Sequence, residues 1–368
     1  NDSKTAFDTN PAVYTYQFMD NEQIQHDLAN AKPVPGSPSY ADDRKLYDAR
    51  VKAAQEIVKL RAADPVGAAI DTKQFGYELL NFEAPDKMMA QLGERVAQAE
   101  SVARDWGGAP RILSKDESAR LVTALNAADV DGKVGLLAQI ANAVGPNGIR
   151  MVSDQLKASD KKYAVAMAGF DITPGDGGMT SGEMYLRGLQ LIAERQIKDD
   201  PAVETGNVAR LYAEINPDND GTQGLFKSDA ARADTVELAR GILAYQQWAD
   251  SGSIEGAIAA AVGGDVEAYN GKKAVMPKGI KSSAIYSEDL GDLVETQAQE
   301  VKKARGMFYV SGLAMTGEEL AAKMPKLALQ TEKVNSDGSV TYSLMLNGES
   351  VFGDDGSLYT FDLVKTKE

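Results

Sequence analysis

The stretch "GGDVEAYNGKKAVMPKG", residues 263–279, follows an alanine-rich segment and interrupts its helical pattern. Two short β-like runs meet at Asn270-Gly271, a dipeptide suited to the two-residue turn in which both central residues have positive φ. A phosphate-binding loop ending in Gly271-Lys272 would need glycine at Val266 and serine or threonine at Lys273, so that alternative fails. The stretch therefore predicts a β-hairpin, which marks where the helical part of the chain ends.

Three segments are expected around this hairpin. Residues 1–39 are polar and end in a proline-rich run, which predicts an extended arm and a semi-rigid tether. Ala12–Met19 fits either a paired strand or a docked arm, and the arm is favoured because no turn signal or partner strand follows. Residues 40–262 repeat apolar residues at three- and four-residue steps and predict one multi-helix domain. Residues 263–368 predict a small α+β subdomain with the hairpin, helices and an antiparallel β-meander. The expected fold class is therefore mainly α with a small C-terminal α+β subdomain.

Local signals place several element boundaries. A serine or threonine followed three residues later by glutamate is typical of a capping box at a helix start, and it occurs at Ser114/Glu117, Thr180/Glu183 and Thr316/Glu319. Asp64-Pro65 predicts a helix end, because the residue before proline disfavours the α conformation. Near the C-terminus, Val340, Tyr342, Leu344 and Leu346 alternate with Thr341, Ser343 and Met345, which predicts a strand. Turn signals at 336–338, 347–348 and 354–356 divide this region into short strands.

Composition limits the function. The chain has 368 residues, 43% hydrophobic and 25% charged, which predicts a folded protein of more than one domain. Its net charge of −15 argues against direct binding to nucleic acid or to an anionic membrane surface. No apolar run reaches the roughly 18 residues of a membrane span. The absence of cysteine excludes thiol catalysis, disulfides and iron–sulfur clusters. The start, without an initiator methionine or signal pattern, suggests a processed chain or a fragment of a longer one.

Motifs for chemistry fail individually. His26, the single histidine, lies in the predicted arm, where a catalytic base would not be held rigidly. Asn216–Lys227 begins like a calcium loop but ends in lysine where a bidentate glutamate is needed, so whether it binds a cation stays open. A dinucleotide fingerprint starting at Gly175 would need its third glycine at Thr180. The sequence therefore assigns no catalytic, cofactor-binding or metal-ligating residue, and no cofactor.

Several motifs together resemble a known family. They are "ADPVG" (residues 63–67), "ARDWGGAPRILSKDESARLVTAL" (103–125), "LLAQIANAVGP" (136–146), "VEAYNGKKAVMP" (266–277) and "LNGESVFGDDGSLYTFDL" (346–363). In this order the chain resembles the internal virion or DNA-ejection proteins of tailed bacteriophages, in their helical accessory region. The resemblance implies a structural protein located in the virion and delivered to the host periplasm on ejection. The implied partners are other virion proteins or copies of the same chain.

Some members of that family carry a lytic transglycosylase domain, whose catalytic glutamate lies in a Glu-Ser motif followed by Gly-Leu-Met-Gln. Here Glu117-Ser118 and Glu349-Ser350 lack that continuation, so no catalytic residue is carried over. The first hypothesis is therefore a non-enzymatic virion protein acting through protein–protein assembly. The second is a peptidoglycan-cleaving glycosidase or transglycosylase with a carboxylate pair, which requires a cleft holding a buried glutamate of raised pKa. The third is a secreted or surface binding module, which predicts an exposed aromatic patch near Tyr342, Tyr359 and Phe361.

Overall fold

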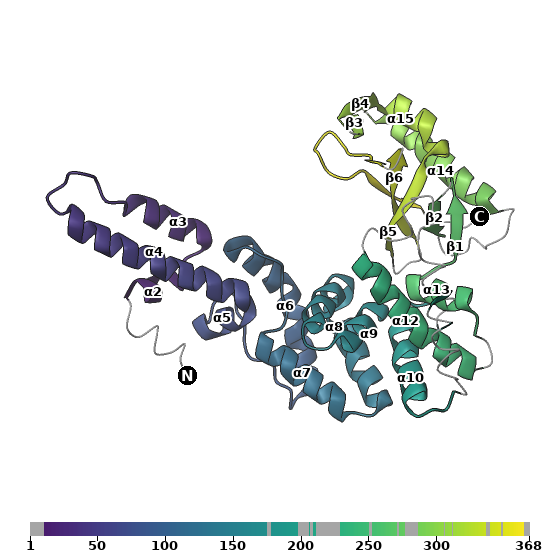
Figure 1. Ribbon diagram of the computed structural model, residues 1–368, viewed down its shortest axis with the longest axis horizontal. Coiled ribbons are helices and arrows are strands. Elements are labelled where there is room, and N and C mark those ends of the chain that lie inside the picture. The colour runs from purple at the N-terminus through teal and green to yellow at the C-terminus, as the bar shows by residue number, and fades with distance from the viewer. Residues whose placement is uncertain are drawn as a thin grey trace. The chain divides into compact units, whose positions relative to one another are not determined.

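The computed structural model of this chain confirms a mainly α fold with a small antiparallel β region near the C-terminus (Figure 1). It describes residues 11–174, 178–197, 206, 209–210, 229–249, 252–270, 272–276, 286–304, 306–310, 312–335, 339–346 and 349–363. Contacts divide the chain into two compact units, Asn1–Ala164 and Val165–Glu368. This division differs from the expected one, because it lies inside residues 40–262.

Helices of the second unit pack with the C-terminal segment, which explains the position of this division. The Ser181 hydroxyl at the start of α10 (Ser181–Ala193) donates to the Ala260 carbonyl of α13 (Ile254–Val262) at 2.6 Å. At the end of α13, a Cβ added to Gly263 would lie 3.0 Å from Val334 of a C-terminal strand. These contacts join residues far apart in sequence, and no local pattern reports them.

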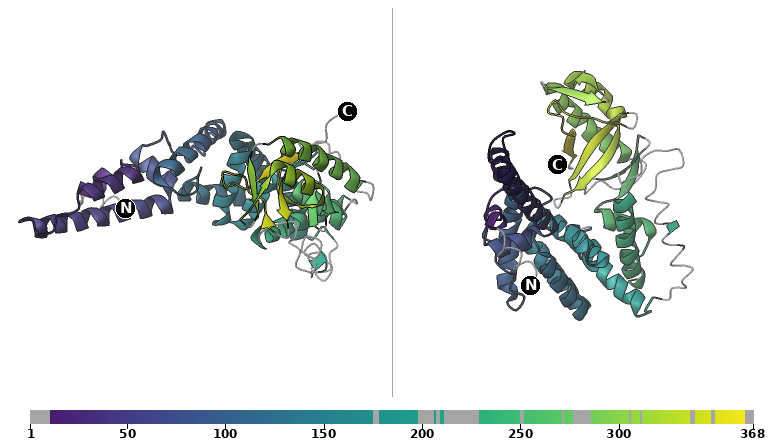
Figure 2. Two further views of the ribbon diagram at one scale, coloured as in Figure 1. Left: turned by 90° about the horizontal axis from the view of Figure 1, so that it is seen from above. Right: turned by 60° about the vertical axis from the view of Figure 1, so that its left-hand side comes forward.

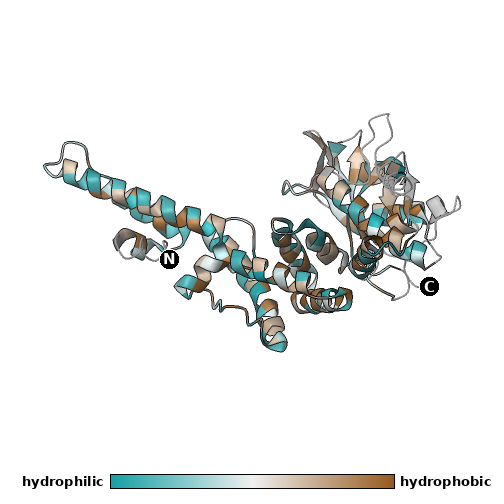
Figure 3. Ribbon diagram, turned by 60° about the horizontal axis from the view of Figure 1, so that its bottom comes forward, coloured by the Kyte–Doolittle hydropathy of each residue, from teal (hydrophilic) through white to brown (hydrophobic). Residues whose placement is uncertain are grey.

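The predicted extended arm is wrong for residues 11–30, which form α2 (Pro11–Tyr16) and α3 (Asn21–Asn30). Both helices pack against α4 (Tyr40–Ala63), and α3 lies beside α4 in Figure 1 and Figure 2. Hydrophilic residues recur along α4, as Figure 3 shows, and its apolar side closes a small core. That core is formed by Val13, Tyr16, Ile24, Ala53, Ala54 and Ile57.

Two sets of polar hydrogen bonds stabilise the helices of this N-terminal region. Asp20 and Gln23 form a reciprocal capping box at the start of α3, which satisfies backbone N–H groups that would otherwise lack partners. The buried guanidinium of Arg61 donates to the carbonyls of Tyr16, Gln17 and Met19 at 2.7–3.2 Å, at the end of α2. The predicted tether corresponds to the connection between α3 and α4.

The rest of the first unit is built from four further helices and the start of a fifth. They are α5 (Pro65–Thr72), α6 (Pro85–Trp106), α7 (Lys115–Ala127), α8 (Val130–Lys157) and α9 (Lys161–Gly169), which crosses into the second unit. The end of α4 before Pro65 and the capping box of Ser114 and Glu117 are both confirmed. Within α8, Gly145 adopts φ 64° before Pro146, so two helical stretches meet there at a kink.

In the second unit, α10 crosses α12 (Asp229–Trp248) at two glycines. A Cβ added to Gly188 would lie 1.8 Å from the carbonyl oxygen of Gly241, so the two backbones approach more closely than any larger residue permits. Thr180 caps α10 by accepting from the N–H of Glu183 at 3.2 Å. The reciprocal half of the predicted capping box is not formed, and the Glu183 carboxylate accepts from Arg187 instead.

The C-terminal region begins with the predicted hairpin. β1 (Val266–Tyr269) pairs antiparallel with β2 (Lys272–Val275) around Asn270, whose φ is 48°. Further elements follow: α14 (Tyr286–Lys303), β3 (Met307–Val310), β4 (Leu313–Thr316), α15 (Gly317–Lys323), the 3-10 turn Met324–Lys326, β5 (Ala328–Val334), β6 (Val340–Leu346), β7 (Glu349–Ser350) and β8 (Thr360–Leu363). The capping box of Thr316 and Glu319 at the start of α15 is confirmed.

In the described ranges all strand pairs are antiparallel, with β6 between β5 on one side and both β7 and β8 on the other. The predicted strand is present as β6, and its residues Val340, Tyr342 and Leu344 are fully buried. They share a core with α14, to which Leu290, Val294 and Ala298 contribute. Ser343 and Met345 are buried as well, so β6 is covered on both faces.

Candidate functional site

The motifs that the sequence offers for chemistry do not converge on one site. His26 lies on an exposed turn of α3, with Nδ1 3.1 Å from Asn30 Nδ2 of the same helix. The calcium-like loop Asn216–Lys227 lies outside the described residues, as do Gly175–Gly177 of the dinucleotide fingerprint. Across the described ranges, no three histidine, cysteine, aspartate or glutamate side chains gather closely enough to hold a metal ion.

Glu117 of the Glu-Ser dipeptide is the one buried carboxylate in the described part of the chain. Its two oxygens accept from Arg95 at 2.7 and 2.9 Å and from the backbone N–H groups of Ser114 and Leu80, both at 2.9 Å. Burial by itself raises the pKa of Glu117, but the hydrogen bonds and charge of Arg95 and the two backbone donors outweigh it and lower the pKa. A general acid must hold its proton near neutral pH, so Glu117 has the opposite properties.

Arg95 is equally buried and connects this carboxylate to two loops. Its guanidinium also donates to the carbonyls of Glu78 and Ile112, the latter at 3.0 Å. The pair therefore joins α6, α7 and the segments that precede them. Its geometry is that of a structural ion pair.

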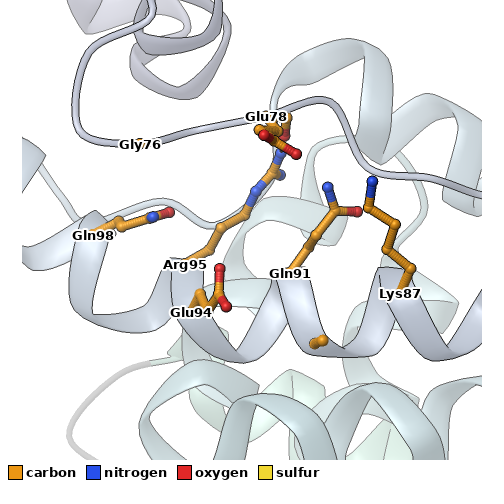
Figure 4. Close-up of a pocket in the computed structure, with 8 residues that line it drawn as sticks. Gly76, Glu78, Lys87, Gln91, Glu94, Arg95 and Gln98 are labelled. Carbon is orange, nitrogen blue, oxygen red and sulfur yellow. The ribbon is translucent and has the colours of Figure 1, made fainter.

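A polar pocket of about 260 Å³ lies next to this pair in the first unit. Figure 4 shows Lys87, Gln91 and Arg95 projecting from α6 toward the segment that carries Gly76 and Glu78. Gln91 accepts from the Asn81 N–H and donates to the Leu79 carbonyl, both at 3.1 Å, and Arg95 donates to Glu78. These side chains hold the loop on the helix, so the contacts in the pocket wall are accounted for by the fold.

The aromatic patch predicted near Tyr342, Tyr359 and Phe361 is wrong. Tyr342 and Phe361 are buried, and Tyr359 is partly buried against the same core, with its ring centroid 5.0 Å from that of Phe308. These three rings belong to the interior of the C-terminal region, so they offer no surface for a binding module.

An exposed apolar row lies instead on the β3–β4 hairpin. Tyr309 pairs with Ala314 of β4 on one side and with Phe352 on the other, and Phe352 also pairs with Leu358. Cross-strand partners lie on the same face of a sheet, so the four side chains form one row about 14 Å long. Tyr309 and Phe352 keep 37% and 40% of their surface exposed. We call Ala314, Tyr309, Phe352 and Leu358 the apolar row.

A groove of about 430 Å³ reaches the same edge from the opposite face of the hairpin. Its lining is apolar at Val310, Leu313, Ala314, Met315 and Leu346 and charged at Glu319, Lys323 and Glu349. Leu313 projects at the hairpin tip with 73% of its surface exposed. The apolar row and the groove together are the candidate functional site.

Sequence reasoning missed this site because its members come from four short segments. One signal was available in the sequence. Residues 307–310 are all apolar, so both faces of this strand are apolar, Phe308 and Val310 on one face and Met307 and Tyr309 on the other. An all-apolar strand next to a two-residue turn indicates either a fully buried strand or one with a partner still to be bound.

In the described ranges, no helix is both long and apolar enough to cross a membrane. Comparison with protein-family models, with curated proteins and with solved structures found no match to this chain.

Proposed function

We propose that this protein is a non-enzymatic structural protein of a tailed-bacteriophage particle, which acts through protein–protein assembly and enters the host periplasm on ejection. The observation that carries the assembly role is the apolar row with its adjoining groove. The particle assignment rests on the resemblance of the motifs between residues 63 and 363 to internal virion proteins.

The candidate site has the physical properties of a protein-binding surface. Grouped exposed aromatic and aliphatic side chains are characteristic of interaction sites, because burying one large apolar side chain contributes roughly 1.5–3 kcal/mol. The row is also rigidly supported, since Phe308, Val310 and Met315 on the other face of the hairpin are buried in the core. A partner would therefore meet a preformed surface and would lose little free energy in ordering it.

Mass spectrometry of purified particles tests the particle assignment. The chain is expected among the particle proteins, and its presence in infected cells but absence from particles would refute the proposal. A double substitution, Tyr309→Ser with Phe352→Ser, tests the assembly surface. It is expected to lower incorporation at least about ten-fold, since roughly 1.5 kcal/mol or more of apolar burial is lost.

The matched control uses another exposed aromatic pair. Tyr14 and Phe18 in the first unit have ring centroids 5.5 Å apart and 60% and 46% exposed surface. Tyr14→Ser with Phe18→Ser removes similar apolar area from residues that are not part of the row, and it is expected to leave incorporation unchanged. Equal losses in both double variants would assign the effect to general solubility rather than to the proposed surface.

A further inference from the structure

The backbone of Tyr309 determines which groups of β4 are free. Tyr309 exchanges two hydrogen bonds with Phe352, N–H to carbonyl in both directions at 2.9 Å. In an antiparallel strand the N–H and the carbonyl of one residue point to the same side. Tyr309 therefore directs both groups toward Phe352 and none toward β4. Its partner across the hairpin, Ala314, is in a pair without hydrogen bonds.

Ala314 accordingly points its N–H and carbonyl away from β3, toward the outer edge of β4. Within the described part of the chain no hydrogen bond satisfies either group, and both Ala314 and Leu313 beside it are exposed. The next outward-facing N–H, that of Thr316, is already bound to Glu319 at 2.8 Å in the capping box of α15. Along the outer edge of β4, the backbone groups of Ala314 are thus free to bind a partner, whereas the N–H of Thr316 is already bound.

We infer that this edge receives an extended segment of another particle protein, which adds a strand beside β4 and carries lysine or arginine at its ends. This inference rests on the proposed function. The incoming residue opposite Ala314 would exchange two backbone hydrogen bonds with it and extend the apolar row by one side chain. Its neighbours in the incoming strand would point into the groove formed by Leu313, Met315 and Leu346.

Charge selects the occupant. Two carboxylates, Glu319 and Glu349, and one ammonium, Lys323, line the groove, and the whole chain carries a net charge of −15. Basic ends on the incoming segment would therefore be attracted to the edge. A second copy of this acidic chain would be repelled. Pairing two four-residue strands would also bury far less than the roughly 1,600 Å² of a standard stable interface.

The test uses the full-length chain and a synthetic probe, acetyl-Lys-Val-Thr-Val-Thr-Val-Lys-amide. The chain is labelled with ¹⁵N-alanine, and the Ala314 amide signal is assigned by its loss in Ala314→Val. Probe binding is expected to shift this signal and to protect the Ala314 N–H from hydrogen exchange. Binding that leaves the exchange of this amide unchanged would refute strand addition, because occupation of the groove by side chains alone does not engage it.

Modified probes test each part of the inference without altering the protein. Replacing both lysines by glutamate is expected to weaken binding at least about ten-fold. N-methylation of the three valines should abolish binding, whereas N-methylation of the two threonines should leave it largely intact, because alternate N–H groups face opposite edges of a strand. Equal affinity of the lysine and glutamate probes, or equal effects of the two methylations, would refute the inference.

One variant removes the proposed donor. Ala314→Pro deletes an N–H that makes no bond within the described chain, and proline is tolerated at strand edges. It should weaken probe binding about ten-fold, the loss of one backbone hydrogen bond, while thermal unfolding remains close to that of the parent protein. The probe data and the particle data fail independently. Presence in particles without protection of Ala314 refutes this inference alone, and protection without presence in particles refutes the particle assignment alone.

Discussion

The buried pair of Arg95 and Glu117 allows the sharpest test of how the first unit is stabilised. Their side chains are 2% and 1% exposed, and Glu117 accepts four hydrogen bonds. Glu117→Gln retains the shape but leaves a guanidinium buried beside a neutral amide. Arg95→Met leaves a carboxylate with two backbone donors only. Each substitution is expected to lower the free energy of unfolding by about 3–5 kcal/mol, the usual cost of breaking a buried pair.

The double variant separates charge from shape. Arg95→Met with Glu117→Gln contains neither buried charge, so the penalty for an unpaired ion disappears. Its cost should therefore be smaller than the sum of the single costs by at least about 1.5 kcal/mol, a coupling within the range for residues in one network. The remaining cost reflects the unpaired carbonyls of Ile112 and Glu78, which Arg95 satisfies in the parent chain.

Urea unfolding followed by tryptophan fluorescence measures these costs. Trp106 is buried in the first unit beneath the Arg61 guanidinium, 4.1 Å from the ring centroid, whereas Trp248 is exposed in the second. A Trp248→Phe background therefore reports on the first unit alone. The control is Asp48→Asn, which breaks an exposed pair with Arg44 and should cost under about 0.5 kcal/mol. Single costs below about 1 kcal/mol, or strict additivity in the double variant, would refute the reasoning.

Three further outcomes follow from individual groups. Gly188→Ala should destabilise the second unit by about 1–3 kcal/mol in thermal melts, because its Cβ would lie 1.8 Å from a carbonyl oxygen, whereas Gly291→Ala in α14, with no atom within 4 Å, should not. The pKa of Glu117 is lowered in the folded protein, so its ionised form stabilises the fold at every pH above its ordinary pKa of 4.5. This stabilisation is lost as the pH falls through the lower pKa of the folded state. Urea titrations between pH 3 and 7 should show the loss, and the Glu117→Gln variant should not. Burial, and after it the hydrogen bond to Asp27, raises the pKa of Tyr16 to about 12. The protonated phenol therefore stabilises the fold fully below pH 10, and this stabilisation is lost as the pH rises through 12. Tyrosinate absorbance at alkaline pH, compared between the parent chain and Tyr16→Phe, measures the pKa of Tyr16.

The features predicted correctly from sequence are those determined by a few neighbouring residues. Asn270-Gly271 gave the hairpin, Ser114 with Glu117 gave a capping box, and Asp64-Pro65 gave a helix end. Each signal depends on backbone conformation or on a side chain that reaches its own helix terminus, so no distant contact can override it easily.

The helix within residues 21–30, where an extended arm was predicted, has a local signal in the sequence. Asp20 and Gln23 form the same type of box as Ser114 and Glu117, with aspartate and glutamine in place of serine and glutamate. The polar composition of residues 1–39 obscured it. The segment contains only three of the apolar residues that form its core, Val13, Tyr16 and Ile24, which is too few to predict a buried face. The other side of this core comes from α4, through Ala53, Ala54 and Ile57. Composition describes a segment alone, and burial depends on what lies against it.

The Glu117-Ser118 dipeptide does not reveal whether its glutamate is catalytic or structural. Position three of a helix places a glutamate where it can reach back to the cap, and at Glu117 that position also meets Arg95 from another helix. The arginine, which reverses the effect of burial on the pKa of Glu117, lies 22 residues away. A catalytic and a structural glutamate therefore share the same local sequence and differ in a distant partner.

The shortness of the free edge of β4 bears on how the proposed assembly would work. Long exposed edges promote indiscriminate strand pairing, and proteins limit this by keeping edge strands short. Here the cap of α15 occupies the N–H of Thr316, so one residue, Ala314, supplies the backbone bonds to a partner. Two hydrogen bonds cannot hold a partner alone, because each contributes only about 0.5–1.5 kcal/mol. Affinity must then come from the apolar row, the groove and opposite charge. A single contact of this kind would be weak, and it would become lasting where many copies are held close together, as in a particle.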